Sequence, residues 1–190
     1  WYAPYTAALQ LIERGDIGPL RSMVGNTTHS LSNIGSHTLA LFRRFAGAQA
    51  SWVSGHMDDD DQALGDGDLA GSGYVVYENG VRVFLNSHVP ANTWSLEFLC
   101  ERGRVVSRNH HATFELWMEE AGEKGLRYDV QKMFPYPWRP RSSMVDAIEG
   151  VARSIEVGQE TVAPGEYGRE ALEIAIALRE SHRRGGVRVD

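Results

Sequence analysis

Hydrophobic residues recur at helical spacing near the start of the chain. In Tyr5–Gly15 and in His37–Phe45 the apolar side chains fall on one side of a helix, and a glycine stands at or just beyond each expected end. On the second of these helices Arg43 and Arg44 fall among the polar positions. We expect both arginines to be solvated.

The last third of the chain repeats the helical pattern twice. One stretch runs from Ser143 to Gly158 and places Val145, Ile148 and Ile155 on a common face. The other covers Glu166–Arg184, with acidic residues in its first turns and arginines at its end, as the helix dipole favours. Each helix has one apolar face that must be covered, and one face of a sheet is the natural partner.

Alternating apolar and polar residues predict strands between these helices. Two apolar runs in Tyr74–Leu85 flank Asn79-Gly80, the favoured pair for a type I′ hairpin. The sequence predicts a mostly antiparallel sheet of about six strands, with helices on one face, in the α+β class. The remaining predicted strands are Pro19–Thr28, Ser51–Ser54, the hairpin of Leu96–Cys100 with Val105-Val106, and Phe114–Met118.

Composition narrows the class of protein. The 190 residues suit one domain, 1–190, and the net charge of −6 with scattered basic residues argues against nucleic acid or an anionic membrane as partner. No apolar run approaches the roughly 20 residues of a membrane span. A single cysteine, Cys100, excludes an internal disulfide or a zinc knuckle. We expect a cytoplasmic protein without a signal peptide, and both ends suggest cuts through a longer polypeptide.

An acidic segment and two glycine pairs are both predicted to belong to loops. Asp58–Asp68 is strongly acidic and lacks the terminal glutamate of a calcium loop, so we interpret it as a solvated loop. The glycine pairs Gly65–Gly67 and Gly71–Gly73 precede a strand rather than opening a helix. They therefore offer no helix N-terminus to a pyrophosphate, and no nucleotide site is predicted in this chain.

His37 is the leading candidate for chemistry. It follows a turn of small residues at the start of a helix, and Asn33 stands four residues before it, so the two side chains share a face. A histidine beside a polar neighbour is a common proton donor or acceptor near neutral pH. From spacing alone, however, a partly buried histidine with a structural role is favoured.

Other chemistries receive less support from the spacing. His110 and His111 are adjacent, so on a strand they point to opposite faces. His29 and His37 flank a turn and are candidates for a metal pair, but no acidic third ligand is near in sequence, and no metal site is predicted. There is no G-x-S-x-G motif, and Cys100 fits a buried strand position rather than a nucleophile.

Several motifs, in order, resemble the C-terminal domain of the glucose–fructose oxidoreductase / inositol dehydrogenase (Gfo/Idh/MocA) family. Trp1–Leu20 resembles the segment that follows the cofactor domain and ends in a "G-x-I-G" type of junction. Asn33–His37 is similar to the family's "D-x-G-x-H" site motif, and Tyr77–Gly80 to its sheet hairpin. Gly165–Val189 is similar to the closing helix, with "S-x-x-x-G" and a strand.

The resemblance implies an open mixed sheet with helices on one face, and a homodimer or homotetramer through the other face. It implies that a Rossmann domain, absent from this chain, binds NAD or NADP and carries the catalytic lysine. His37 then matches the catalytic histidine of an oxidoreductase acting on a sugar, cyclitol or related polyol. Asn33 is its neighbour and a substrate contact. The chain alone is expected to be inactive.

Two departures from the family's motif bear on the chemistry. Its acidic residue is Asn33 here, and the acid that often follows the histidine is Ala40. These changes support an alternative, a non-catalytic ligand-binding or oligomerisation module of the same fold. Trp138 and Arg139 lie in a proline-rich loop and are further candidates for substrate binding. A metal-dependent enzyme that uses His29 and His37 is a third hypothesis.

Overall fold

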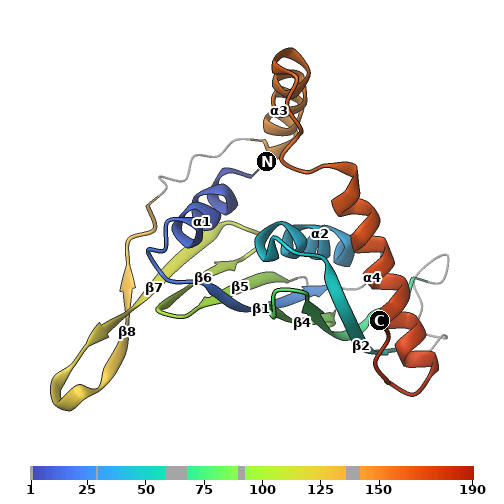
Figure 1. Cartoon of the computed structure of the whole chain (residues 1–190), viewed down its shortest axis with the longest axis horizontal. Coiled ribbons are helices and arrows are strands. Elements are labelled where there is room, and N and C mark those ends of the chain that lie inside the picture. The colour runs from blue at the N-terminus through green and yellow to red at the C-terminus, as the bar shows by residue number, and fades with distance from the viewer. Residues whose placement is uncertain (1, 29, 59–67, 90–92, 136–141) are drawn as a thin grey trace.

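The chain folds into one large sheet with helices (Figure 1). The computed structural model describes residues 2–28, 30–58, 68–89, 93–135 and 142–190. The helices are α1 (Ala3–Glu13), α2 (Ile34–Ala46), α3 (Ser143–Val157) and α4 (Gly165–Arg183). The strands are β1 (Leu20–Thr28), β2 (Ala50–Met57), β3 (Gly71–Tyr77), β4 (Arg82–Val89), β5 (Trp94–Cys100), β6 (Gly103–Arg108), β7 (Thr113–Ala121) and β8 (Arg127–Lys132).

The described strands form a mixed sheet in the order β2-β3-β4-β1-β5-β6-β7-β8. Of the neighbouring pairs, β1 and β4 are parallel and the others are antiparallel. The first strand in sequence therefore lies in the middle, between a group of strands on each side. This confirms the predicted α+β class and the mostly antiparallel sheet.

The sheet is larger than the sequence predicts, with eight described strands rather than about six. The strand that went unpredicted is β8, which is mostly polar and exposed. It pairs with β7 in a hairpin that extends past the helices (Figure 1). Ion pairs cross this hairpin, from Arg127 to Glu119 and from Lys132 to Glu120. No apolar alternation marks β8, because both of its faces meet solvent over most of its length.

The predicted hairpin at Asn79-Gly80 forms between β3 and β4, but its turn differs from type I′. That type needs a positive φ at both central residues, and here Gly80 has one (83°) while Asn79 does not. The Asn79 amide instead donates a hydrogen bond of 2.7 Å to the carbonyl of Ala46, the last residue of α2. The turn thus ties the hairpin to the end of that helix.

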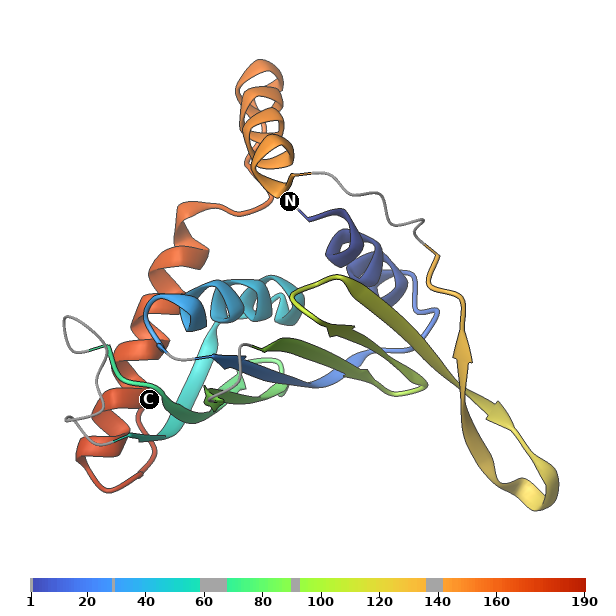
Figure 2. The ribbon, with the colours of Figure 1, turned by 180° about the vertical axis from the view of Figure 1, so that it is seen from behind.

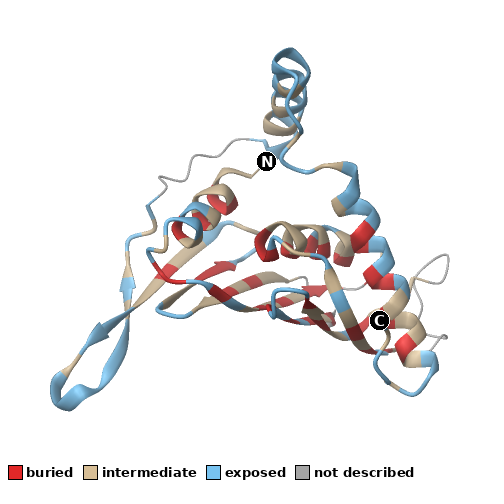
Figure 3. Ribbon diagram, in the orientation of Figure 1, coloured by how far each residue is buried: buried red, intermediate tan, exposed pale blue. Residues whose placement is uncertain are grey.

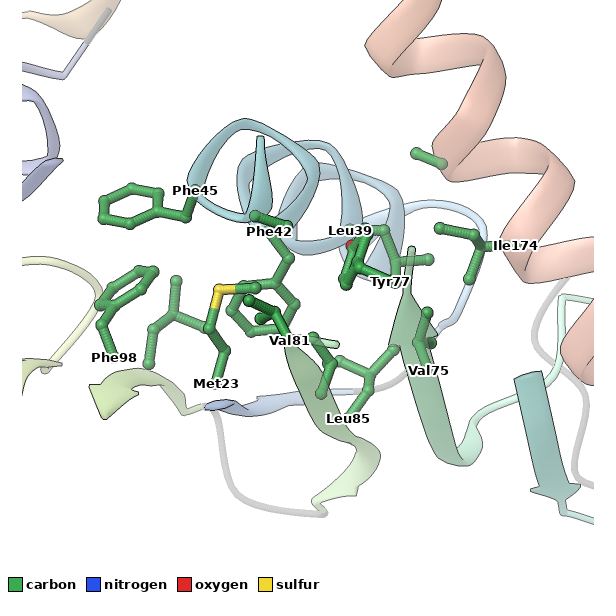
Figure 4. Packing of buried hydrophobic residues seen from close by; sticks show 14 of the residues in the cluster. Met23, Leu39, Phe42, Phe45, Val75, Tyr77, Val81, Leu85, Phe98 and Ile174 are labelled. Carbon is green, nitrogen blue, oxygen red and sulfur yellow. The ribbon is translucent and has the colours of Figure 1, made fainter. Parts of the chain in front are cut away.

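Three helices, α1, α2 and α4, cover one face of the sheet (Figures 1 and 2). The buried residues gather between these helices and the strands (Figure 3), and α2 lies over the centre of this core (Figure 4). Gly25 of β1 allows the close approach, since a Cβ there would lie 2.9 Å from the Phe42 ring. Among the described residues, no helix is long and apolar enough to cross a membrane.

The helix α3 does not cover the sheet, so its predicted packing is wrong. It projects away from the sheet in both views (Figures 1 and 2), and none of its residues is buried. Ile148 and Ile155, on the predicted apolar face, are 66% and 77% exposed. The periodicity correctly indicates a helix with an apolar stripe, but the described chain does not bury that stripe.

The contact between α2 and α4 corrects a second prediction. Arg43 is not solvated, because its side chain is only 14% exposed and forms an ion pair with Glu170 of α4. Its guanidinium carbon also lies 5.0 Å from the centre of the Tyr167 ring. Buried charges are tolerated only when they are paired, so this contact fixes the two helices against each other.

Candidate functional site

The start of α2 is anchored by the carboxylate of Asp68. The backbone N–H groups of Ser32 and Asn33 donate hydrogen bonds of 2.8 and 3.0 Å to it, and the Ile34 N–H donates to the Ser30 hydroxyl. Partial burial alone would raise the pKa of Asp68, but these hydrogen bonds outweigh it, and the pKa lies below its ordinary value. This end of the predicted acidic loop is therefore a structural anchor for α2.

The anchored helix presents His37 at a cavity of about 510 Å³. The imidazole is exposed and lies near Trp94 of β5, with 6.3 Å between the two ring centres. The cavity lies between α1, α2, the turn after β6 and the first turn of α4. Its lining residues are Tyr2, Tyr5, His37, Ala40, Leu41, Arg44, Trp94, His111, Ala163, Pro164, Gly165, Tyr167 and Gly168.

Tyr5 and His111 form a partly buried polar contact in the wall of this cavity. The Tyr5 hydroxyl lies 2.5 Å from Nδ1 of His111 and 3.0 Å from the Ser107 hydroxyl. Burial raises the pKa of Tyr5 well above its ordinary value. Burial, aided by the neighbouring His110, lowers the pKa of His111 to about 4. His111 is therefore neutral at pH 7, so it can exchange hydrogen bonds there but carries no positive charge.

His111 reaches the cavity from an unusual turn. Asn109, His110 and His111 have φ values of 52°, 52° and 70°, in the left-handed region that side chains rarely adopt. Each such residue costs about 1–3 kcal/mol, and strain of this kind clusters at functional sites. His110 and His111 do not lie on a strand, where they would point to opposite faces, because they form the turn between β6 and β7.

The side chains of Asn33 and His37, predicted to act together, share no hydrogen bond within the described residues. Asn33 is exposed just before α2, and its backbone rather than its side chain makes the hydrogen bond to Asp68. Within the described residues, no hydrogen bond joins the Asn33 and His37 side chains, and Asn33 does not line the cavity. Its role in substrate binding stays a prediction. The other candidates for binding, Trp138 and Arg139, lie outside the described residues.

The other residues considered in the sequence analysis have structural roles or lie outside the described residues. Cys100 is half-buried in β5, and burial raises its pKa to about 12, so the thiol is protonated. Gly71 and Gly73 lie within β3, where side chains would collide with Met57 and Leu178. Among the described residues, no group of three histidine, cysteine or acidic side chains is placed to hold a metal ion. His29 lies outside those residues.

Sequence reasoning missed several residues of the cavity. Arg44 shares a face with His37 because the two are seven residues apart on α2, and Leu41 lies between them. That spacing was available in the sequence and signals a common face. Tyr5, Trp94 and His111 come from three other elements, and no sequence spacing links them to α2.

No protein-family model matches the sequence, and no curated protein matches it significantly. Solved structures do match its fold. An aldose–aldose oxidoreductase from Caulobacter crescentus, complexed with glycerol, has a TM-score of 0.78 and 16% identity, with 98% of this chain and 60% of that chain covered. UDP-N-acetylglucosamine 3-dehydrogenase GnnA from Acidithiobacillus ferrooxidans has a TM-score of 0.68 and 16% identity, covering 92% and 57%.

A third structure is an oxidoreductase from Agrobacterium radiobacter in complex with NAD⁺, L-tartaric acid and magnesium. It has a TM-score of 0.69 and 14% identity, with 98% of this chain and 61% of that chain covered. The chain thus spans about 60% of the length of the solved structures that it matches. At these identities the likeness establishes the fold. The chain has the fold that was expected from its resemblance to the C-terminal domain of the Gfo/Idh/MocA oxidoreductases.

Proposed function

We propose that this chain is the C-terminal substrate-binding domain of an NAD(P)-dependent oxidoreductase of the Gfo/Idh/MocA family. Its substrate is a sugar, a cyclitol or a related polyol, and His37 is the group that exchanges a proton with the reacting hydroxyl. The observation that carries the proposal is the position of His37. In a fold shared with sugar oxidoreductases, it lies at the mouth of a cavity lined by aromatic and polar side chains.

The cavity has the composition of a site for a small polar ring. Tyr2, Trp94 and Tyr167 offer flat apolar surfaces, and His37, Arg44 and His111 offer polar atoms. Its volume of about 510 Å³ lies within the range of small-molecule sites. Glycerol and L-tartaric acid, which are bound in two of the matching structures, are both small polyhydroxylated molecules. A polyol substrate is consistent with all of these features.

His37 is suited to the proton transfer that the proposal requires. It is exposed to the cavity, makes no hydrogen bond within the described residues, and lies on a helix whose start is fixed by Asp68. An uncharged imidazole accepts the hydroxyl proton during oxidation, and the imidazolium returns it during reduction. A bound nicotinamide cofactor would supply the hydride chemistry, while His37 would hold or release the hydroxyl proton.

The described residues do not fit a dinucleotide site. Gly71 of β3 packs against the neighbouring strand β2 and Gly73 packs against Leu178 of α4, and in the described ranges no G-x-G-x-x-G turn opens a helix. We propose that the cofactor, NAD or NADP, is bound mainly by a part of the protein outside this chain. Substitutions in the His37 cavity should leave the affinity of the full-length protein for NAD or NADP unchanged.

The test is His37→Ala in the full-length protein, assayed on a panel of sugars and cyclitols with NAD and NADP. We expect the turnover number to fall by about 10²–10⁴-fold, while the thermal unfolding temperature and the dinucleotide affinity stay near the wild-type values. His56→Ala, an exposed histidine on β2 outside the cavity, is the matched control. Near-normal turnover of the His37 variant would overturn the assignment.

A second candidate, a non-catalytic module that keeps the fold, is favoured by one observation. Ala40 lines the cavity where the family motif often has an acid, and none of the described lining residues has an acidic side chain. Ligand binding and assembly without turnover of any panel member by the wild-type protein would identify this module.

We also propose that the sheet face opposite the helices joins copies into a homodimer or homotetramer. Trp52, Tyr74 and Phe84 form an aromatic row on this face, with 5.4 and 4.9 Å between successive ring centres. Phe84 is 52% exposed. Phe84→Asp should therefore shift the mass measured by light scattering towards the monomer, and an unchanged mass would contradict this interface.

A further inference from the structure

A half-buried arginine shares the cavity with His37. Arg44 lies two helical turns after His37 on α2, so both side chains reach the same cavity. His37 is assigned to the reacting hydroxyl, and Arg44 lies along the helix from it. A ligand that reaches His37 with one end therefore has a guanidinium near another part.

Arg44 differs from its neighbour Arg43 in having no anionic partner within the part of the chain that the structure describes. Arg43 is paired with Glu170, whereas no carboxylate in the described chain lies within 4 Å of Arg44. Burial lowers the pKa of Arg44, and the opposing influences of Tyr167 and of the exposed Glu13 do not outweigh it. Ala40 stands four residues before Arg44, where an acid would pair with it, and supplies only a methyl group.

A half-buried guanidinium without a partner is costly, since arginine stays charged at any physiological pH. Tyr167 and Trp94, on the cavity wall, are apolar apart from one polar atom each. A bound anion would recover the lost solvation through charge-assisted hydrogen bonds, and the planar guanidinium suits a carboxylate or a phosphate group.

The charge of the described cavity lining also favours a bound anion. Among the described residues that line it, none is acidic, and the ionisable groups are Arg44, two histidines and three tyrosines. Gly165, Tyr167 and Gly168 belong to the first turn of α4, so the positive end of that helix dipole also lies at the wall. A neutral sugar makes no use of this positive field, whereas an acidic sugar does.

We propose that the His37 cavity selects a sugar or polyol bearing an anionic group, and that Arg44 binds that group. The inference rests on the proposed function, because it takes the ligand's reacting hydroxyl to lie at His37. Carboxylate and phosphate share the required chemistry, and the experiment below separates them.

The first arm compares D-glucose with D-glucuronate and D-glucose 6-phosphate in the full-length protein with NAD and NADP. We expect kcat/KM for one of the acidic sugars to exceed that for D-glucose by about tenfold or more, and Arg44→Gln to remove this preference through KM. Arg44→Lys, which keeps the charge, should retain part of it. Arg14→Gln, an exposed arginine outside the cavity, is the matched control.

The second arm measures binding without turnover. Saturating D-glucuronate or D-glucose 6-phosphate should raise the unfolding temperature of the wild type and the Arg14 variant, but not of Arg44→Gln, and added salt should weaken the effect. The shift in unfolding temperature with inorganic phosphate alone distinguishes a site for any anion from a site that also requires the sugar. Equal responses of wild type and Arg44→Gln would overturn the inference, even if His37→Ala abolishes turnover. If no sugar is turned over, the proposed function fails, and the temperature shifts alone decide whether Arg44 binds anions.

Discussion

The helices α3 and α4 carry similar apolar stripes, yet the structure treats them in opposite ways. On α4, Ala171, Ile174 and Leu178 are 1%, 4% and 0% exposed. On α3, Val145, Ile148 and Ile155 are 44%, 66% and 77% exposed. The two helices follow each other in the chain, and both were expected to cover the sheet. An apolar stripe therefore indicates which face of a helix is suited to burial, but it does not predict which surface, if any, will cover that face.

The surface beneath α4 explains the difference. Gly55 of β2 and Gly73 of β3 lie under Leu178, where a Cβ would come within 2.7 and 2.8 Å of its atoms. These glycines let the helix backbone approach the strands closely, and Ser181 fastens its end by accepting a hydrogen bond of 2.9 Å from the Gly55 N–H. No residue of α3 reaches a buried position of this kind.

The largest effect on stability should come from shortening a buried side chain of α4, because α3 has no buried side chain. Leu178→Ala leaves a cavity against β2 and β3 and should lower the free energy of unfolding by about 2–5 kcal/mol. Ile148→Ala removes a similar side chain from α3 and should change it by less than about 0.5 kcal/mol. Urea denaturation of both variants measures the contrast. Comparable losses would mean that the α3 face is buried in solution.

The next effect concerns the ion pair that joins α4 to α2. Glu170→Ala leaves the Arg43 guanidinium buried without its partner, and should cost about 3 kcal/mol of unfolding free energy. Glu173→Ala on the same helix breaks an exposed pair with Arg169, and should cost less than about 0.5 kcal/mol. A loss for Glu170→Ala as small as that for Glu173→Ala would show that the buried pair does not hold α2 against α4.

The smallest effect is a response to acid in the packed layer, where His111 lies; α3 contains no histidine. The pKa of His111 falls from 6.5 to about 4 on folding, so the unfolded state alone binds its proton between these values. Stability attributable to this group is full above pH 6.5, decreases by at most about 1.4 kcal/mol per pH unit below it, and levels off below pH 4.

Urea denaturation at pH 7 and pH 5 of the wild type and His111→Gln measures this response. The wild type should lose more stability than the variant over that interval. Equal losses would place the His111 side chain in water, away from Tyr5.

The candidate site was predictable in part. His37 could be singled out because a turn of small residues precedes a helix with a clear apolar face, and Arg44 follows at a spacing that keeps it on the same side. Asp68 was interpreted as loop, because its two hydrogen bonds are to backbone groups 35 and 36 residues away. The turn that carries His111 was not predicted, because nothing in the sequence specifies three successive residues with positive φ.

Local patterns in the sequence were enough to predict the four helices, most of the strands and the glycines that end helices. Backbone periodicity and local turn chemistry are properties of neighbouring residues, so they can be read without the fold. Three features required the folded chain: β1 lies beside β4, α4 is buried while α3 is not, and Tyr5, His111 and Arg44 share a cavity with His37. These outcomes depend on contacts between distant segments, where the close approach of backbones and the pairing of buried charges choose among faces that local patterns leave equivalent.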